Sequence, residues 1–279
     1  MNYNLIAQRV GEILGENAEY HTMPKGKYLL NAIVIGSGNV RPQFYVDDFA
    51  KEFKSEEEIA CAIANTYKKS NVNPFDNLPN FTDFACVKDM IIPCLVNEGA
   101  FIDSDIVTNK FAEDIDTCYR IVIDNNASCV IRKVMLEMWG ISIEELHNVA
   151  IHNLDEKEYY FEDLIKTMLE LVEVDEETKN QMIEEQSGYM YVLSNTNKVY
   201  GANNLLNEKT LATIQEKIGD YFIIPSSIHE CILLPYNEFA DVSQISRMVR
   251  EVNTNEVSED EVLSYSVFCY KAECGLKVA

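Results

Sequence analysis

The spacing of hydrophobic residues changes repeatedly along the chain between the period of a helix and that of a strand. Ile6, Val10 and Ile13 recur at helical intervals with charged residues between them, which predicts an amphipathic first helix. Residues 28–35 form a nearly continuous apolar run that ends at the Gly-Ser-Gly-Asn turn of residues 36–39, and this pattern predicts a strand. The N-terminal part is therefore expected to combine both kinds of element.

Helix signals dominate the next stretch. Residues 47–69 are predicted to be helical with a break near Ser55, because Ser55 and Glu58 have the spacing of a capping box. A second helix is expected over residues 84–97, although Pro93 must kink it or end it.

Turn and loop signals separate these helices from the elements that follow. The prolines and asparagines of residues 71–80 predict a loop. Residues 116–134 have the pattern of a β-hairpin whose turn falls at residues 125–126, a pair of asparagines that tolerate positive φ. Ser142 and Glu145 form another capping-box pattern in front of a helix.

The composition changes between residues 155 and 185, where acidic residues crowd around an apolar helical stripe. This pattern indicates an acidic helix with a loose linker, and a boundary between two lobes is expected there. The predicted domains are an N-terminal α+β lobe at residues 1–154, the acidic helix and linker at 155–187, and a C-terminal α+β lobe at 188–279.

The C-terminal part is predicted to consist of short strands and helices. Strands are expected at residues 189–193, 199–201 and 265–270, and helices are expected around Leu211 and after Asp241. Strands and helices do not alternate as in a parallel sheet. The predicted fold class is therefore α+β, with mixed, largely antiparallel sheets, flanking helices and two lobes.

The densest cluster of reactive side chains lies in residues 221–236, which read YFIIPSSIHECILLPY. Two short apolar runs bounded by prolines flank a polar bend, which predicts two buried strands joined at a corner. The bend carries the candidate catalytic residues of the chain, namely Ser226, Ser227, His229 and Glu230.

Two interpretations of this bend are open. In a hydrolase, Ser226 or Ser227 would be the nucleophile, His229 the base, and Glu230 or a distant aspartate the group that orients the base. A serine and a histidine two or three residues apart rarely face each other, however, and the glycines of a nucleophile elbow are missing. In the structural interpretation, which we favour, the hydroxyls bond to the turn backbone and His229 satisfies a neighbouring carboxylate or carbonyl.

No ligand spacing predicts a metal site or another cofactor. His229 is not followed by a second histidine at metalloprotease spacing, and His147 and His152 are five residues apart on a predicted helix, which turns them to different faces. The eight cysteines form no CxxC pair and are expected to be reduced. Cys231 opens an apolar strand, which is typical of an inert core thiol rather than a nucleophile.

The charge balance is strongly acidic. Among 279 residues, 46 are Asp or Glu and 23 are Lys or Arg, which gives a formal net charge of −23. Such a surface repels phosphate backbones and anionic lipid headgroups, so direct binding to nucleic acid or to a membrane is not expected. Solubility alone can account for an acidic excess of this kind.

These observations favour a non-enzymatic binding or regulatory protein that acts on a protein partner through its acidic surface. A special form of this hypothesis is a protein that imitates nucleic-acid charge and blocks an enzyme that binds nucleic acid, as an antagonist carried by a mobile element would. A secretory signal and an apolar run of membrane-spanning length are both absent from the sequence, which predicts a cytoplasmic location.

Several short sequence motifs of the chain are distinctive. They are YMYVLSN at 189–195, YGA at 200–202, IPSSIHE at 224–230, MVREVN at 248–253, and upstream FTDF at 81–84, Trp139-Gly140 and EEL at 144–146. In these segments the chain resembles an uncharacterised bacterial family, the domain-of-unknown-function family numbered fifty-six eighty-eight. The resemblance covers nearly the whole length. It implies a cytosolic bacterial protein without a known activity and without catalytic residues to carry over.

Overall fold

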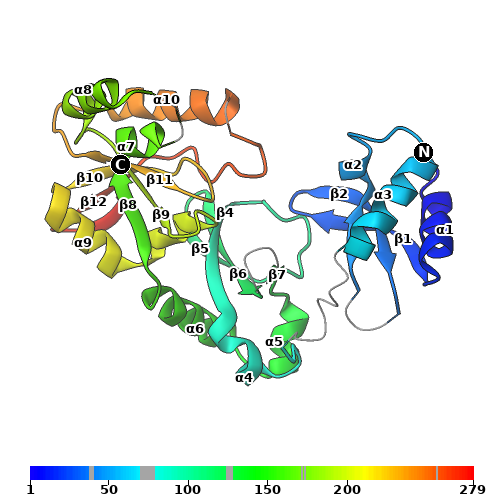
Figure 1. Cartoon of the computed structure of the whole chain (residues 1–279). Coiled ribbons are helices and arrows are strands. Elements are labelled where there is room, and N and C mark those ends of the chain that lie inside the picture. The colour runs from blue at the N-terminus through cyan, green and yellow to red at the C-terminus, as the bar shows by residue number, and fades with distance from the viewer. Residues whose placement is uncertain (38–40, 70–78, 124–127, 171, 173, 256) are drawn as a thin grey trace. The chain divides into compact units, whose positions relative to one another are not determined.

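The computed structural model describes residues 1–37, 41–69, 79–123, 128–170, 172, 174–255 and 257–279. Its strands form three sheets in which every described strand pairing is antiparallel, with helices alongside, so the predicted α+β class is confirmed (Figure 1). The chain divides into two compact units. Unit 1 comprises Met1–Pro79 and Phe101–Ser104, and unit 2 comprises Asn80–Ala100 and Asp105–Ala279.

Unit 1 is a three-stranded sheet with helices packed against it. Its elements are α1 (Tyr3–Leu14), β1 (Ala18–Lys25), β2 (Tyr28–Ile35), β3 (Gln43–Tyr45), α2 (Val46–Phe49) and α3 (Glu56–Lys69), and the strand order is β1-β2-β3. Ile6, Val10, Ile33, Ile59 and Ile63 are fully buried and form its core. The apolar period of α1 therefore turns one face of that helix onto β2 and α3, as predicted.

The capping box before α3 is present. Ser55 Oγ accepts a hydrogen bond from the N–H of Glu58 at 3.2 Å, and Oε2 of Glu58 accepts one from the N–H of Ser55 at 3.1 Å. Each side chain thus satisfies a backbone donor that the first helical turn leaves unpaired.

The first part of unit 2 is a four-stranded sheet. Its elements are α4 (Phe84–Val87), the 3-10 helix η1 (Lys88–Met90), β4 (Ile91–Asn97), β5 (Thr108–Ala112), β6 (Ile115–Val122), β7 (Ser128–Val130), α5 (Lys133–Trp139) and α6 (Ile143–Asp155). The strand order is β4-β6-β5, and β7 pairs with the far end of β6. Ser142 caps α6 as predicted, because its Oγ accepts from the N–H of Glu145 at 3.1 Å.

The helix predicted over residues 84–97 is wrong beyond Met90. Ile91–Asn97 is strand β4, and its first six residues are all buried. A strand covered on both faces has a continuous apolar run instead of an alternating one, and in so short a run this pattern cannot be told from part of a buried helix. Pro93 lies within this strand opposite Tyr119 of β6.

The second part of unit 2 is a six-stranded sheet. Its elements are β8 (Tyr159–Asp163), α7 (Leu164–Leu169), α8 (Glu176–Gln186), β9 (Tyr191–Asn195), the 3-10 helix η2 (Gly201–Leu206), α9 (Glu208–Ile218), β10 (Tyr221–Ile224), β11 (Cys231–Pro235), α10 (Val242–Asn255), β12 (Phe268–Lys271) and β13 (Gly275–Val278). The strand order is β13-β12-β10-β11-β9-β8. The two apolar runs of residues 221–236 thus pair as antiparallel strands near the middle of the sheet.

One further expectation, a strand at residues 199–201, differs from the structure. Residues 199–201 do not form a returning strand, because Gly201 opens η2 instead. The acidic region 155–187 contains the strand β8, which pairs with β9, and it lies inside unit 2. The boundary between two lobes that is expected at residues 155–187 stays a prediction.

A late segment of unit 2 is joined to the first sheet by hydrogen bonds over long sequence distances. Asp114 Oδ2 accepts from Ser264 Oγ at 2.7 Å and from the N–H of Tyr265 at 3.1 Å. Asn97 Nδ2 donates to the carbonyl of Leu263 at 3.0 Å. Residues 263–265 therefore fasten the chain just before β12 onto β4 and the β5–β6 connection.

Some predicted features lie outside the described residues. These are the turn at 125–126, most of the loop at 71–80 and the second half of the turn at 36–39. Within the described residues, no helix combines the length and the apolar character that crossing a membrane requires.

Candidate functional site

The bend between β10 and β11 contains the residues that the sequence singled out. Ser227 Oγ accepts a hydrogen bond from the backbone N–H of His229 at 3.0 Å, and the N–H of Ser227 donates to the carbonyl of Glu230 at 3.2 Å. Both contacts close the turn, as serine hydroxyls and turn amides commonly do. The structure therefore joins Ser227 to His229 through the backbone.

The imidazole of His229 faces a different neighbour, Tyr200. Its Nδ1 accepts a hydrogen bond from the N–H of Tyr200 at 3.1 Å, and the two ring centroids are 5.7 Å apart. Its Nε2 lies 3.6 Å from Oε1 of Glu261, so the N–H of the neutral ring at Nε2 faces this carboxylate. Within the described part of the chain, no hydrogen bond connects the imidazole with the hydroxyl of Ser226 or Ser227. In this arrangement the ring supports the segment at Tyr200.

The segment after β9 lies so close to the bend that Gly201 has no room for a side chain. A Cβ at Gly201 would collide with Oγ of Ser194, and it would lie 2.5 Å from the N of Asn195 and 2.6 Å from the O of His229. Ser194 Oγ itself donates to the carbonyl of His229 at 2.8 Å. The end of β9, the start of η2 and the bend therefore interlock.

The turn between β9 and η2 has a strained backbone. Lys198 has a φ of 54° and Tyr200 a φ of 58°, and they are the described residues other than glycine in the left-handed region. The amide of Asn195 holds this turn, because its Nδ2 donates to the carbonyl of Val199 at 2.6 Å and its Oδ1 accepts from the N–H of Val199 at 3.2 Å. Strain of this kind costs about 1–3 kcal/mol per residue and is concentrated at functional sites.

The strained turn forms one wall of a cavity of about 670 Å³ inside unit 2. The other walls come from the first sheet, α6 and η2, and the lining residues are Ile92, Val122, Ser128, Leu154, Lys157, Glu158, Asn195, Thr196, Asn197, Val199, Tyr200, Asn203 and Asn204. The volume is in the range of small-molecule sites, which is about 300–1,000 Å³. No motif predicts this cavity, because its walls are brought together from segments far apart in the sequence.

Two buried amides tie η2 to its surroundings. Asn203 Nδ2 donates to the carbonyl of Pro93 in β4 at 3.0 Å. Asn204 Nδ2 donates to the carbonyls of Ser194 and Gly201, both at 3.0 Å. These contacts fix the position of η2 between the two sheets of unit 2.

A cation lies close to Tyr200 at the cavity. The guanidinium carbon of Arg120 is 5.1 Å from the centroid of the Tyr200 ring, and Nε of Arg120 donates to Ser128 Oγ at 3.1 Å. Burial raises the pKa of Tyr200, so its hydroxyl stays protonated at neutral pH and can donate a hydrogen bond. The arrangement offers hydrogen bonds and an aromatic surface rather than a nucleophile.

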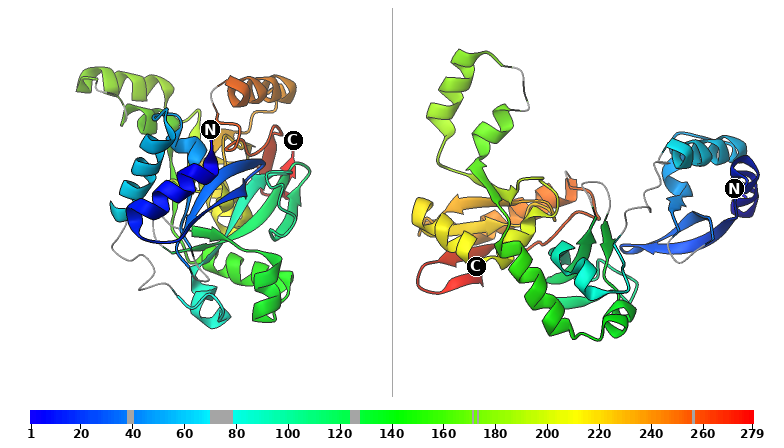
Figure 2. Two further views of the ribbon diagram at one scale, coloured as in Figure 1. Left: turned by 90° about the vertical axis from the view of Figure 1, so that its right-hand side faces the viewer. Right: turned by 60° about the horizontal axis from the view of Figure 1, so that its bottom comes forward.

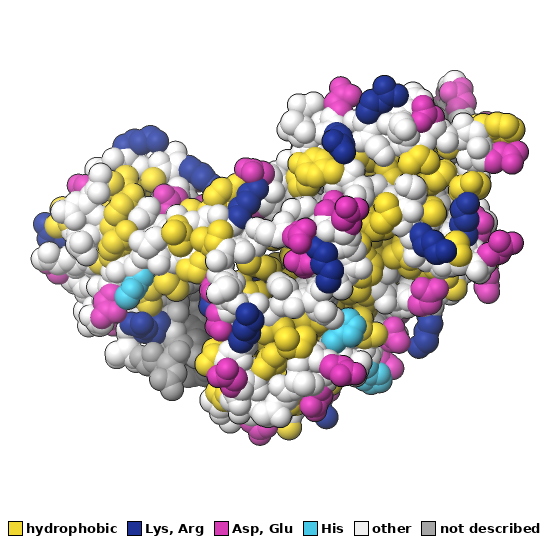
Figure 3. All heavy atoms as spheres, turned by 180° about the vertical axis from the view of Figure 1, so that it is seen from behind, with side chains coloured by type: hydrophobic (Ala, Val, Ile, Leu, Met, Phe, Trp, Pro, Cys, Tyr) yellow, Lys and Arg dark blue, Asp and Glu magenta, His cyan; other side chains and the backbone are white. Residues whose placement is uncertain are grey.

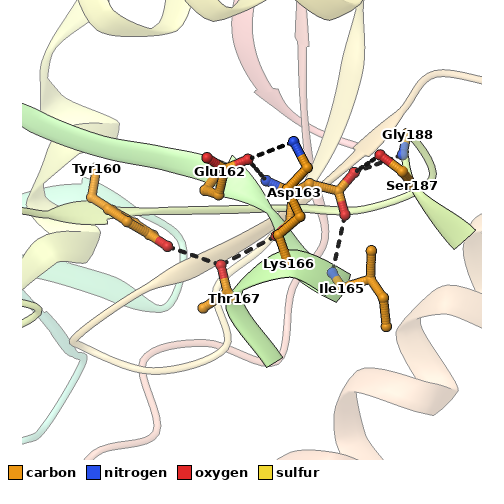
Figure 4. A network of polar contacts seen from close by, with 8 residues as sticks. All are labelled: Tyr160, Glu162, Asp163, Ile165, Lys166, Thr167, Ser187 and Gly188. Atoms are coloured by element: carbon orange, nitrogen blue, oxygen red, sulfur yellow. Dashed lines mark hydrogen bonds and ion pairs between the residues drawn. The ribbon is translucent and has the colours of Figure 1, made fainter. Parts of the chain in front are cut away.

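A second region that differs from the rest of unit 2 is the arm formed by α7 and α8. The side chain of Asp163 contacts both the start of this arm and the chain that returns from it (Figure 4). The Asp163 side chain is 4% exposed, and its Oδ1 accepts from the N–H of Ile165 at 3.0 Å. Its Oδ2 accepts from Ser187 Oγ at 2.8 Å and from the N–H of Gly188 at 2.6 Å. One carboxylate thus caps α7 and fastens the returning chain after α8.

The outer helix of this arm, α8, packs only loosely against the rest of unit 2. None of the residues of α8 is buried, and in two views the helix lies away from the strands of the sheet (Figure 2). Asp175 caps its N-terminus, and hydrogen bonds from Thr178 lower the pKa of that carboxyl. The exposed side chains of the arm and its base combine acidic with apolar ones, namely Met168, Glu170, Val172, Val174, Asp175, Glu176, Glu177, Glu184, Glu185, Tyr189 and Met190.

The described residues contain no group of three or more His, Cys, Asp or Glu side chains that could hold a metal ion. His147 Nδ1 lies 2.9 Å from the hydroxyl of Tyr119, and burial lowers the pKa of that histidine. Burial also raises the pKa of the Cys231 thiol, which therefore stays protonated. These groups have the environment of core side chains.

Comparison with known proteins identifies a family. The model of the family of unknown function DUF5688 matches residues 3–272. No curated protein and no solved structure matches the chain. The matched range includes the bend, the cavity and the arm.

Proposed function

The chain belongs to the DUF5688 family of unknown function, and from its own geometry we propose that it is a non-enzymatic protein that binds a basic protein partner through the α7–α8 arm. The observation that carries this proposal is the contrast within the arm. A buried carboxylate, Asp163, fixes its base, whereas α8 buries none of its residues. A helix without a buried face gains little stability from packing, and its side chains stay open to contacts with a partner.

The charge distribution supports a basic partner. Unit 2 contains 35 of the 46 acidic residues and 15 of the 23 basic ones, a formal charge of −20. The helix α8 contributes four glutamates, Glu176, Glu177, Glu184 and Glu185, against one lysine, Lys179. Complementary charge of this kind steers association and selects partners.

Exposed apolar side chains supply the remaining requirement of a docking surface. Met168 is 54% exposed and Tyr189 is 69% exposed at the base of the arm. Apolar contacts provide affinity at the centre of an interface, while charges at its rim provide orientation and rate. We therefore expect a partner segment that has both apolar and basic side chains.

The hypothesis that the protein imitates the charge of a nucleic acid has less support. On the face shown in Figure 3, acidic and basic side chains lie interspersed among apolar ones instead of forming one continuous acidic field. A hydrolase built on Ser226, Ser227, His229 and Glu230 also has less support, because Nδ1 of His229 accepts from Tyr200 and Ser227 Oγ accepts from His229 N–H. We propose a cytoplasmic location, where a reducing environment would keep the eight free cysteines as thiols.

The test uses zero-length carbodiimide cross-linking in an extract of the source cells, which joins carboxylates to lysine amines of a bound partner. We expect cross-links on the glutamates of α8, and the purified partner should bind the chain more weakly as the salt concentration rises. The variant Glu176→Lys, Glu177→Lys, Glu184→Lys and Glu185→Lys should bind at least about tenfold more weakly.

The matched control reverses exposed glutamates of unit 1, namely Glu12→Lys, Glu16→Lys, Glu52→Lys and Glu57→Lys, which gives the same change of net charge. It should bind as the unchanged protein does. Equal weakening by both variants would mean that only net charge matters, and unchanged binding by the α8 variant would rule the arm out.

A further inference from the structure

The cavity of unit 2 is lined by a residue with a buried hydrogen-bond acceptor that no group of the described residues satisfies. We propose that the cavity binds a small neutral molecule that donates a hydrogen bond from a hydroxyl or an amide N–H to Asn203. This site is independent of the α7–α8 arm.

Asn203 has the environment of a ligand-binding amide. The residue lines the cavity, it is 3% exposed, and its Oδ1 has no hydrogen-bond partner among the described residues. More than nine in ten buried polar groups in proteins are paired, so an orphan acceptor at the wall of a cavity indicates a missing donor. The Oδ1 atom exposes less than 1 Å², so the side chains around it must shift slightly before a donor from the cavity can reach it.

The orientation of the Asn203 amide follows from its other contact. Nδ2 lies 3.0 Å from the carbonyl oxygen of Pro93, which can only accept. Exchanging the two amide atoms would place two acceptors against each other. The unsatisfied atom is therefore the oxygen, and the ligand must supply a donor.

The rest of the lining favours a neutral ligand. Ile92, Val122 and Leu154 provide apolar wall, and the charged liners are Lys157 and Glu158, which are exposed neighbours of opposite sign. Their charges oppose each other at short range. The guanidinium of Arg120 does not line the cavity, and it contacts the Tyr200 ring and Ser128 Oγ. Most of the other liners are uncharged polar side chains, which suit a ligand that carries hydroxyl or amide groups.

The polar wall is held in place before any ligand binds. Tyr200 adopts its left-handed conformation with its N–H bonded to His229 and its ring near the guanidinium of Arg120. The Asn195 amide bonds to both backbone groups of Val199. A site fixed by its own contacts loses little conformational entropy on binding.

The experiment follows the side-chain and backbone amides of the full chain by NMR during titration with uracil, which carries amide N–H donors, and with glucose, which carries hydroxyls. Sodium acetate serves as the charged comparison. We expect saturable shifts of Asn203, Asn204 and Tyr200 with at least one neutral probe and none with acetate.

Three variants test the assignment. Asn203→Leu removes the acceptor and should weaken binding at least about tenfold. Val199→Trp fills the cavity from a side chain that is 44% exposed and that leaves the Asn203 amide in place, so it should abolish binding in a folded protein. The matched control is Asn253→Leu, because Asn253 is equally buried and donates to the carbonyl of Ser264 outside the cavity. This variant should bind as the unchanged protein does.

The outcomes are decisive in both directions. Binding that is lost in Asn203→Leu and Val199→Trp and kept in Asn253→Leu supports the proposal. The proposal is overturned if neither neutral probe shifts these resonances, if Val199→Trp binds normally, or if a structure determined with the probes shows only water at Asn203 Oδ1.

Discussion

At the scale of single residues, the junction at Gly201 depends on the absence of a side chain rather than on an unusual φ. The atoms that a Cβ would meet include the backbone N of Asn195 and the backbone O of His229. The backbone atoms of β9 and of the bend cannot rotate away, whereas the end of a long side chain can. The junction therefore has little tolerance for added volume.

We expect Gly201→Ala to lower the free energy of unfolding by about 3 kcal/mol, at the upper end of the usual range for overpacking. The measurement is chemical denaturation followed by circular dichroism. Gly99→Ala is the control, because Gly99 has a φ of 77° but no atom within 4 Å of its Cβ position. It should cost only about 1 kcal/mol, from backbone strain alone.

The pH dependence of stability should contain a contribution from His147. Burial lowers its pKa in the folded state, so the unfolded chain binds a proton more readily. The contribution of His147 to the free energy of unfolding is fully present above the histidine pKa of the unfolded chain, about 6.5, and is lost as the pH falls below that value.

Thermal unfolding between about pH 7 and pH 5 measures this slope. His147→Gln should make it shallower. His152→Gln changes an exposed histidine on the same helix and should leave the slope as it is. Equal slopes in the unchanged protein and in His147→Gln would contradict the prediction.

At this scale, the sequence predicts contacts between residues that are near neighbours in the chain. The caps at Ser55 and Ser142 join residues three apart, and both are present. Asn203 bonds to Pro93 over 110 residues, and no local pattern indicates such a contact. The cavity depends on contacts of the second kind, and for this reason sequence analysis missed it.

At the scale of elements, the arm depends on one carboxylate at its base. Asp163 accepts three hydrogen bonds in a buried position, and two of them hold the chain that returns from α8. Its removal should release the arm without opening the sheet, since β8 pairs with β9 through its own backbone.

We therefore expect Asp163→Ala to raise amide hydrogen exchange across residues 164–190, with a loss of local stability of about 3 kcal/mol, because hydrogen bonds to a buried charge are lost. Exchange in β10 and β11 should not change. Asp175→Ala removes only the cap of α8 and should affect that helix alone. Faster exchange throughout unit 2 in Asp163→Ala would show that the carboxylate holds more than the arm.

Amphipathic helices were easier to predict than buried strands. The helix α1 shows its apolar face in the sequence, whereas β4 is apolar on both faces and resembles a helix segment. The strand β8 lies in the acidic region and owes its place to pairing with β9. Pairing of this kind is a tertiary contact, and short-range sequence patterns contain no record of it.

At the scale of the whole molecule, the dominant property is uncompensated negative charge. A formal charge of −23 repels itself in the compact state, and dissolved salt screens this repulsion. Most of the exposed ion pairs of the chain contribute little to stability. The stability lost when salt screens them is therefore smaller than the stability gained when salt screens the repulsion.

Raising sodium chloride from about 20 mM to about 200 mM should therefore increase the melting temperature. The variant Glu176→Gln, Glu177→Gln, Glu184→Gln and Glu185→Gln carries four fewer negative charges and should show a smaller increase. A melting temperature that falls with salt in the unchanged protein would show that ion pairs outweigh repulsion.

The fastening of residues 263–265 onto the first sheet has a consequence for synthesis of the protein. Asn97 and Asp114 leave the ribosome long before their partners Leu263, Ser264 and Tyr265 exist. Strand β12, which pairs with β10 at the inside of the six-stranded sheet, is translated later still. We therefore expect unit 2 to stay incompletely folded until β12 has been synthesised, and a nascent chain halted before residue 263 to expose apolar surface that chaperones bind.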